Sequence, residues 1–268
     1  MRPPESTLWK ILKFFQLHKL YRAVKRFLPT SVVNVVSYIT LKNVHIPLIY
    51  VEALEPSYEM AWKYLQRFDD DPGDYLEFGV SQGTSMACMH RVLNKLGLDK
   101  VRLFGFDSFE GMPGSAAEED KGRWRPGQFA CAIEKTEKFL SKEKVDWSRT
   151  FLIKGWFEDT LNDKTTKQYG IEKASVLMID CDIYSASKAA LNYSLPMITD
   201  HSVLFFDDWL DDINFGEYRA YSEFLNEHKN LQSTEIGTYY DTGKIFCITN
   251  TSAPESKHAG ELEKQHLA

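Results

Sequence analysis

Two short apolar runs decide the fold of this chain, Ser175–Asp182 (SVLMIDCD) and Ser202–Trp209 (SVLFFDDW). Both are rich in Val, Leu, Ile and Phe without polar alternation, which is typical of a strand buried on both faces of a parallel sheet. Each run carries two aspartates at its end, and an unpaired carboxylate is too costly to bury inside such a strand. We therefore expect the aspartates just past the carboxyl ends of the strands, where open α/β sheets bind their ligands.

The sequence on either side of these runs alternates between strand and helix patterns. We expect helices near 55–68, 84–96, 134–140, 185–194 and 217–227, and strands at 75–80, 101–107, 150–154, 175–180, 202–207, 232–239 and 244–248. This alternation predicts an α/β fold, with a doubly wound, mostly parallel seven-stranded sheet and helices on both faces. The ending of helix, strand and strand indicates that one antiparallel strand is added late.

The charge of the chain is uneven. Residues 1–45 carry eight Lys and Arg against one Glu, so the remainder sums to −13 within a net charge of −6. An acidic main body argues against a nucleic-acid-binding protein, whose footprint would be basic. We expect three parts: a basic, helical N-terminal extension at 1–45, a main domain at 46–250, and a flexible tail at 251–268.

The segment Leu8–Leu28 has the periodicity of a basic amphipathic helix. Such a helix can lie on an anionic membrane surface or pack on the core or a second subunit. We favour the packing role and expect a homo-oligomer. The four cysteines form no CxxC pair, and no signal peptide is recognisable, so we expect a soluble, cytoplasmic protein.

The aspartates predict a metal site. Asp180, Asp207 and Asp208 end two strands that, as sheet neighbours about 4.8 Å apart, would bring the carboxylates to one ion. An all-oxygen donor set suits a hard cation such as Mg²⁺. Asp182 lies two residues beyond Asp180 and is our candidate general base. The alternative for Asp182 and Asp208 is that they cap the helices that follow.

Two glycines follow the first strand, in the run Glu77–Ser85 (EFGVSQGTS). Gly79 and Gly83 allow a sharp turn and the close approach of a ligand to a helix start, which we expect Thr84 or Ser85 to cap. Many α/β proteins have such glycines for packing alone. The further glycine of a dinucleotide-binding fingerprint is missing, which favours a nucleoside without a phosphate.

The ends of the second and third strands extend this candidate cofactor site. Asp107 can accept hydrogen bonds from a ribose diol, and we include the next residue, Ser108. The alternative is that Asp107 caps a helix that begins at Ser108. Gly155 and Trp156 follow the third strand and could flank a purine ring, although Trp156 suits an ordinary core position equally well.

The segment Gly111–Gln128 is long for a connection and follows the second strand on the ligand side. We predict that it is a mobile lid over the acceptor substrate. Arg123, Trp124 and Arg125 are the residues that we expect to contact this substrate.

Five motifs together carry a family resemblance: EFGVSQGTS, LFGFDSFEGMP, LIKGWFEDTL, IDCDIYSASKAAL and VLFFDDW. Because these motifs occur in the order and at the spacing typical of the macrocin O-methyltransferase family, the chain resembles this family over roughly Ile46 to Ile248. These enzymes depend on S-adenosylmethionine and a metal ion and methylate sugar hydroxyls of antibiotics. The resemblance implies a Rossmann-like methyltransferase fold and a small-molecule hydroxyl acceptor, such as a sugar of a natural product or glycan.

The resemblance also implies roles for single residues. It places Glu77, Gly79 and Ser85 around the methionine part of the cofactor, Asp107 at the ribose and Trp156 at the adenine. It points to the same three metal ligands that the strand ends suggest, with Asp180 also beside the cofactor. Two other readings remain open. One is a metal-dependent glycosyltransferase, for which Asp180-Cys181-Asp182 would be the DxD motif. The other is a non-catalytic scaffold built on a methyltransferase frame.

Overall fold

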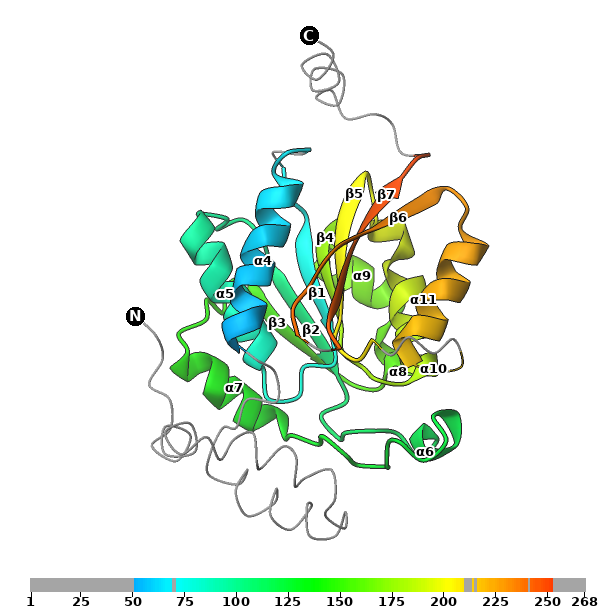
Figure 1. Ribbon diagram of the computed structural model, residues 1–268. Helices are drawn as coiled ribbons and strands as arrows, with labels where there is room; N and C mark the ends of the chain where they lie inside the picture. The colour runs from blue at the N-terminus through cyan, green and yellow to red at the C-terminus, as the bar shows by residue number, and fades with distance from the viewer. Residues whose placement is uncertain (1–50, 69–70, 210–213, 215, 241, 253–268) are drawn as a thin grey trace, which may run out of the picture. The chain divides into compact units, whose positions relative to one another are not determined.

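The computed structural model describes residues 51–68, 71–209, 214, 216–240 and 242–252, which all belong to one compact unit (Figure 1). The expected N-terminal extension at 1–45, its helices and nearly all of the expected tail lie outside the described residues. A sheet of seven strands forms the centre of the described part. The strands are β1 (Asp74–Phe78), β2 (Leu103–Asp107), β3 (Thr150–Lys154), β4 (Ala174–Ile179), β5 (His201–Phe206), β6 (Leu231–Thr238) and β7 (Lys244–Asn250).

The order of the strands across the sheet is β3-β2-β1-β4-β5-β7-β6. Strands β1 to β5 pair in parallel, and β7 is antiparallel to both of its neighbours. This confirms the predicted doubly wound sheet and the single antiparallel strand. The chain runs from β1 outward to β3 and then returns to the other side of β1 for β4 and β5. A sheet of this kind binds ligands beyond the strand ends where the order reverses, here between β1 and β4.

Helices cover both faces of the sheet (Figure 1). They are α4 (Val51–Leu65), α5 (Thr84–Leu96), α6 (Ala116–Glu119), α7 (Ile133–Lys142), α8 (Phe157–Thr160), α9 (Asp163–Tyr169), α10 (Tyr184–Ser194) and α11 (Gly216–Glu227), with a 3₁₀ turn at Leu195–Met197. In Figure 1, α4 and α5 lie on one side of the sheet and α10 and α11 on the other. None of the helices in the described ranges combines the length and apolar character needed to cross a bilayer.

Strand β4 shows why the sheet is apolar on both faces. Val176 and Met178 join the core cluster that contains residues of α4 and α5, whereas Leu177 and Ile179 join the cluster with residues of α10 and α11. Successive side chains of a strand point to opposite faces, so a strand covered on both sides must be apolar at every position. This is the pattern from which the strand was predicted.

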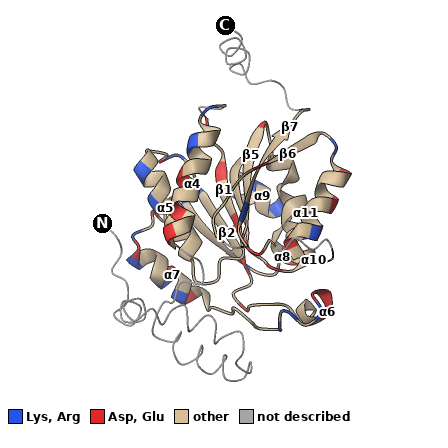
Figure 2. Ribbon diagram, viewed as in Figure 1, with Lys and Arg blue, Asp and Glu red and all other residues tan. Residues whose placement is uncertain are grey.

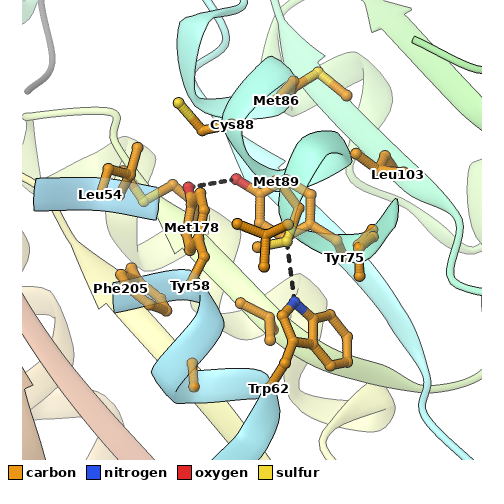
Figure 3. Close-up of a cluster of buried hydrophobic side chains, with 14 of the residues drawn as sticks. Leu54, Tyr58, Trp62, Tyr75, Met86, Cys88, Met89, Leu103, Met178 and Phe205 are labelled. Atoms are coloured by element: carbon orange, nitrogen blue, oxygen red, sulfur yellow. Dashed lines mark hydrogen bonds between the residues drawn. The ribbon is translucent and has the colours of Figure 1, made fainter. Parts of the chain in front are cut away.

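The core beneath α4 contains paired polar atoms (Figure 3). The hydroxyls of Tyr58 and Tyr75 are 2.9 Å apart, and Trp62 Nε1 donates to Met89 Sδ at 3.0 Å. Buried polar groups are costly when unpaired, so these bonds allow large aromatic side chains to fill the core. The Tyr75 hydroxyl also donates to Glu77, which links this cluster to the end of β1.

Three short helices, α6, α8 and α9, were not predicted. Helix α9 begins after Asn162, whose side chain accepts hydrogen bonds from the backbone N–H groups of Lys164 and Thr165, and it buries no residue. A helix of seven residues without an apolar face gives no periodic signal in the sequence.

Candidate functional site

The pairing of the strands continues one residue past their carboxyl ends and brings the candidate residues side by side. Gly79 N donates to Phe106 O at 2.9 Å, Asp180 N to Phe78 O at 2.9 Å, and Asp207 N to Ile179 O at 3.2 Å. Gly79, Asp180 and Asp207 therefore follow three adjacent strands in one row. This row lies at the reversal point between β1 and β4.

Gly79 is a point of close backbone contact. Its φ is +94°, and a Cβ at this position would overlap the carbonyl oxygen of Asp180. Only glycine meets both conditions without strain. The turn after β1 and the acidic loop after β4 are therefore in direct contact.

The start of α5 differs from the expectation. Gly83, with φ +78°, is the N-cap residue, and no side chain caps the helix, so the expected cap by Thr84 or Ser85 is wrong. Thr84 and Ser85 are instead the first residues inside the helix and are buried. Ser85 uses its hydroxyl for another partner, because it donates to the Glu77 carboxylate.

Glu77 lies in β1 with 0% of its surface exposed. Its two carboxylate oxygens accept hydrogen bonds from Tyr75 and Ser85. Burial raises the pKa of Glu77 to about 8, against which these two hydrogen bonds act. The structure therefore places Glu77 beneath the glycine turn, engaged with protein groups.

The side chain of Asp107, at the end of β2, binds the backbone of the glycine turn. Its Oδ2 accepts from Val80 N at 2.8 Å and Ser81 N at 2.7 Å, and its Oδ1 accepts from Phe109 N at 2.6 Å. The last bond closes a local turn, and no helix begins at Ser108, so the alternative of a helix cap is wrong. A carboxylate offers about four lone-pair sites and three are used here, so Asp107 can still accept about one hydrogen bond from a ligand.

The remaining candidates of this half of the site lie close to Asp107. Ser108 is buried, and its hydroxyl accepts from Glu110 N at 3.1 Å. Gly155 N donates to Asp107 O at 3.0 Å, which brings the end of β3 beside the end of β2. Trp156 is half-buried at the N-cap of α8 and is absent from the buried core clusters of the described residues.

The second half of the site is acidic. Ile179 pairs with Phe206 in the sheet, so Asp180 and Asp207 follow neighbouring positions. Asp182 is buried and has a φ of +61°. It does not cap the next helix, because the N-cap of α10 is Ile183 and no side chain caps that helix.

The acidic side chains act strongly on one another. Burial raises the pKa of Asp180 well above its usual range, and the charges of Asp207 and Asp208 raise it further. Burial and the charge of Asp208 have the same effect on the pKa of Asp182. The pKa of Asp207 rises to about 7, with burial as the main cause and Asp208 next. Close carboxylates without a cation raise one another's pKa in this way.

The donor set fits a hard cation in its chemistry, because the cluster offers only oxygen ligands. The described residues nevertheless contain no group of three His, Cys, Asp or Glu side chains already arranged to hold a metal ion. One further observation favours a positively charged ligand. Glu217 Oε1 is inaccessible to solvent and makes no hydrogen bond of good geometry, and burial together with the charges of Asp208 and Asp207 raises the pKa of Glu217 well above its usual range.

Sequence analysis missed three residues of this site. Glu217 accepts a hydrogen bond from Asp208 N at 3.1 Å. Tyr239 OH donates to Asp207 Oδ1 and Tyr240 OH to Asp207 O, both at 3.0 Å. A signal for Glu217 exists, since it shares the buried face of α11 with Ala220, Tyr221 and Phe224. A carboxylate on the apolar face of a helix needs a partner inside the protein.

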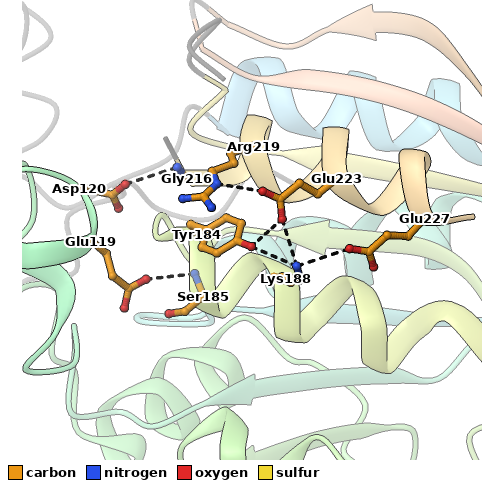
Figure 4. Close-up of polar contacts among 9 residues, drawn as sticks. All are labelled: Glu119, Asp120, Tyr184, Ser185, Lys188, Gly216, Arg219, Glu223 and Glu227. Carbon is orange, nitrogen blue, oxygen red and sulfur yellow. Dashed lines mark hydrogen bonds and ion pairs between the residues drawn. The ribbon is translucent and has the colours of Figure 1, made fainter. Parts of the chain in front are cut away.

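The expected lid contacts the starts of two helices (Figure 4). Glu119 accepts a hydrogen bond from Ser185 N of α10 at 3.1 Å, and Asp120 accepts one from Gly216 N of α11 at 3.3 Å. Trp124 is half-buried, whereas Arg123 and Arg125 are exposed. In Figure 2, Lys and Arg are interspersed with Asp and Glu along the helices of the described part.

A profile of the macrocin-O-methyltransferase (TylF) family matches residues 64–237, more than half of the chain. The chain belongs to this family. This result confirms the resemblance that the five motifs indicated. The matched range includes the glycine turn, Asp107 and all four aspartates of the acidic site.

Two curated relatives are similar in sequence. One is the 8-demethyl-8-(2,3-dimethoxy-alpha-L-rhamnosyl)-tetracenomycin-C 4'-O-methyltransferase of Streptomyces olivaceus, 29% identical over 150 residues, which is 54% of this chain and 56% of the relative. The other is the demethyldecarbamoylnovobiocin O-methyltransferase of Streptomyces niveus, 26% identical over 169 residues, 58% of this chain and 62% of the relative. The chain thus spans somewhat more than half the length of these relatives.

Solved structures support the fold. The O-methyltransferase NovP superposes with a TM-score of 0.63 at 19% identity, covering 76% of this chain and 82% of NovP. The calicheamicin methyltransferase CalS11 superposes with a TM-score of 0.56 at 18% identity, covering 71% of this chain and 77% of CalS11. The Rossmann-like methyltransferase fold that the resemblance implied is confirmed.

Proposed function

We propose that this protein is an S-adenosylmethionine-dependent O-methyltransferase that methylates a hydroxyl of a small molecule with the help of Mg²⁺ or another divalent cation. One observation carries the proposal: in a chain of the macrocin-O-methyltransferase family, the glycine turn after β1 touches the acidic loop after β4. A methyl donor at the first and a hydroxyl at the second would lie next to each other. Positioning of this kind can accelerate a bimolecular transfer greatly.

The chain's own residues suit the methyl donor. Asp107 keeps about one unused lone-pair site and would accept a hydrogen bond from a ribose hydroxyl, beside the buried Ser108. Trp156 and Gly155 would flank the adenine at the end of β3. The positive-φ turns at Gly79 and Gly83 would admit the methionine end, with Glu77 and Ser85 beneath them. S-adenosylmethionine supplies a methyl group on a positively charged sulfur, which makes the methyl open to attack.

Asp180, Asp207 and Asp208 would hold the divalent cation. A cation bound there would lower the pKa of an acceptor hydroxyl and orient it. Tyr239 and Tyr240 support this arrangement, because their hydroxyls fix Asp207 through its side chain and its backbone. Groups that hydrogen-bond to a metal-ligating side chain in this way orient the ligand in many proteins.

Asp182 is the proposed general base. It lies in the loop after Asp180, and its left-handed backbone directs the chain sharply before α10. Without a cation, burial and the nearby Asp208 raise the pKa of Asp182. The proposed cation would favour the ionised carboxylate, which can then take a proton from a hydroxyl.

We propose a sugar hydroxyl of a natural product or glycan as the acceptor. The Streptomyces olivaceus relative is named for a rhamnosyl-bearing tetracenomycin, and the family takes its name from macrocin. Segment 111–128 would cover this acceptor as a lid, with Arg123, Trp124 and Arg125 in contact with it. We further propose a cytoplasmic homo-oligomer to which residues 1–45 contribute.

Calorimetry tests the class of reaction. We expect S-adenosylhomocysteine to bind and UDP not to bind, because the glycine turn lacks the glycine pattern of a phosphate site. Mass spectrometry of a pool of glycosylated metabolites, incubated with protein and an isotopically labelled methyl donor, would then identify the acceptor. Binding of UDP without S-adenosylhomocysteine would instead favour the glycosyltransferase reading.

The cation and its ligands are tested by substitution. We expect Asp180→Asn and Asp207→Asn to lower turnover by at least about a hundredfold while S-adenosylhomocysteine still binds, because each change removes a proposed ligand. Asp107→Ala should instead weaken S-adenosylhomocysteine binding, because it removes the proposed partner of the ribose. Full activity of the unaltered protein in excess EDTA would contradict the role of a cation.

The two alternative readings have less support. A DxD glycosyltransferase does not agree with membership of a methyltransferase family. A non-catalytic scaffold gives no reason for burying several acidic side chains beside one another, since this arrangement destabilises the fold without a ligand.

A further inference from the structure

Glu217 is a buried acid that none of the roles proposed above uses. It is the second residue of α11 and has 0% of its surface exposed. Carboxylates are rarely fully buried unless they are paired with a cation or held by hydrogen bonds. The surroundings of Glu217 therefore indicate what it does.

The carboxylate of Glu217 points into the acidic site. Its Oε2 accepts a hydrogen bond from Asp208 N at 3.1 Å, whereas its Oε1 is buried near the backbone of Asp182 without a hydrogen bond of good geometry. Because the two oxygens belong to one carboxylate, Oε1 also lies beside Asp208. Leaving such an oxygen unsatisfied costs free energy, and a bound cation with its water shell would relieve that cost.

The residue before Glu217 fixes its place between two loops. Gly216 has a φ of +38°, and a Cβ there would overlap the carbonyl oxygen of Asp182. On the other side, Asp120 of the lid accepts the N–H of Gly216 (Figure 4). The first turn of α11 is thus held against the loop after β4, while Glu217 reaches the loop after β5.

We propose that Glu217 is a positioning residue of the acidic site, which holds Asp208 through its backbone and, once a divalent cation is bound at Asp180, Asp207 and Asp208, adds a further negative charge that stabilises this cation. This inference rests on the proposed function, because it presupposes that these aspartates bind a cation. It assigns Glu217 a role through Asp208 and through its charge, without direct contact with the acceptor.

Titration of the full chain with Mn²⁺ in a calorimeter tests the proposal. Glu217→Gln keeps an acceptor oxygen for Asp208 N but removes the charge, and we expect it to weaken Mn²⁺ binding about tenfold or more. Glu217→Ala removes both and should weaken binding further. The matched control is Glu227→Gln on the same helix, which is exposed and pairs with Lys188 at 3.6 Å. It should bind Mn²⁺ like the unaltered chain.

The outcomes separate this inference from the proposed function. Mn²⁺ binding to the unaltered chain that is lost in Asp207→Asn but unchanged in Glu217→Gln overturns the role of Glu217 alone. Failure of the unaltered chain to bind Mn²⁺ overturns the cation role and this inference together. Thermal unfolding of Glu217→Gln checks that the fold persists. In turnover assays, we expect more Mn²⁺ to restore part of its activity, which a general loss of structure would not allow.

Discussion

The backbone at Gly79 adopts a φ of +94° and lies against the carbonyl of Asp180. At this scale the site depends on the absence of a side chain as much as on its carboxylates. Sequence analysis identified Gly79 as a turn residue, but the contact with Asp180 depends on the pairing of β1 with β4 and could not be predicted.

Gly79→Ala should therefore be strongly destabilising. The left-handed backbone alone costs an alanine about 1–2 kcal/mol, and the overlap with Asp180 adds to this cost. Gly97→Ala is the matched control, because Gly97 has a φ of +70° with nothing within 4 Å of an added Cβ. Chemical denaturation should show a clearly larger loss of unfolding free energy for Gly79→Ala than for Gly97→Ala. Equal losses would contradict the close contact.

Glu77 makes the stability of the protein depend on pH. Its pKa of about 8 in the folded chain lies above the ordinary value of 4.5, so the folded chain keeps a proton that the unfolded chain loses. The stabilisation is complete below about pH 4.5 and decreases as the pH rises towards 8, by at most about 1.4 kcal/mol per pH unit.

Unfolding of Glu77→Gln measures this contribution. The amide cannot titrate, so we expect the free energy of unfolding of this variant to fall less between pH 5 and 8 than that of the unaltered chain. Because the two proteins share all other titrating groups, the contributions of those groups cancel in the difference between the two pH profiles. Parallel pH profiles for the two proteins would show that Glu77 titrates in its ordinary range.

At the scale of elements, the segment from Gly111 to Gln128 is held by two acidic side chains at helix starts, Glu119 at α10 and Asp120 at α11. Negative charges are favourable at helix N-termini, and both contacts are hydrogen bonds to backbone N–H groups. Met112 and Ala116 of the segment also pack against Ile183 in a small apolar cluster. This cluster is much smaller than the two that cover the sheet, so the segment should open more easily than the sheet.

Limited trypsin digestion tests this. Lys121 and Arg123 are cleavage sites within the segment, whereas Pro126 protects the bond after Arg125. Removing two hydrogen bonds of about 1 kcal/mol each in Glu119→Ala with Asp120→Ala should speed cleavage by up to about thirtyfold. Glu118→Ala on the same short helix, where Glu118 is exposed, should leave the rate unchanged. A lid would be contradicted if trypsin cleaved the unaltered chain at the same rate with and without cofactor and acceptor.

The elements that could be predicted are those with strong periodicity. Strand β4 and helix α11 were located to within one residue, because their apolar positions repeat at the periods of a buried strand and an amphipathic helix. Helix α9 was missed because all its residues are polar or partly exposed. The predicted capping residue of α5 was wrong, because Ser85, a typical capping residue, donates its hydroxyl to Glu77 instead.

At the scale of the whole molecule, the doubly wound sheet could be predicted, since strand–helix alternation leaves few topologies. That Asp180 and Asp207 lie side by side at the ends of adjacent strands follows from this topology. The roles of Glu217, Tyr239 and Tyr240 could not be predicted, because they depend on how a late helix and the β6–β7 pair return to the ends of β4 and β5.

The contact between Gly79 and Asp180 has one more consequence. The turn after β1 and the loop after β4 are in backbone contact, so a displacement of one bears on the other. If the proposed methyl donor and cation bind at these two places, thermodynamic linkage demands reciprocity: the factor by which saturation with donor changes the dissociation constant of the cation equals the factor by which the cation changes that of the donor. Neither equilibrium constant can be regarded as a property of one ligand by itself.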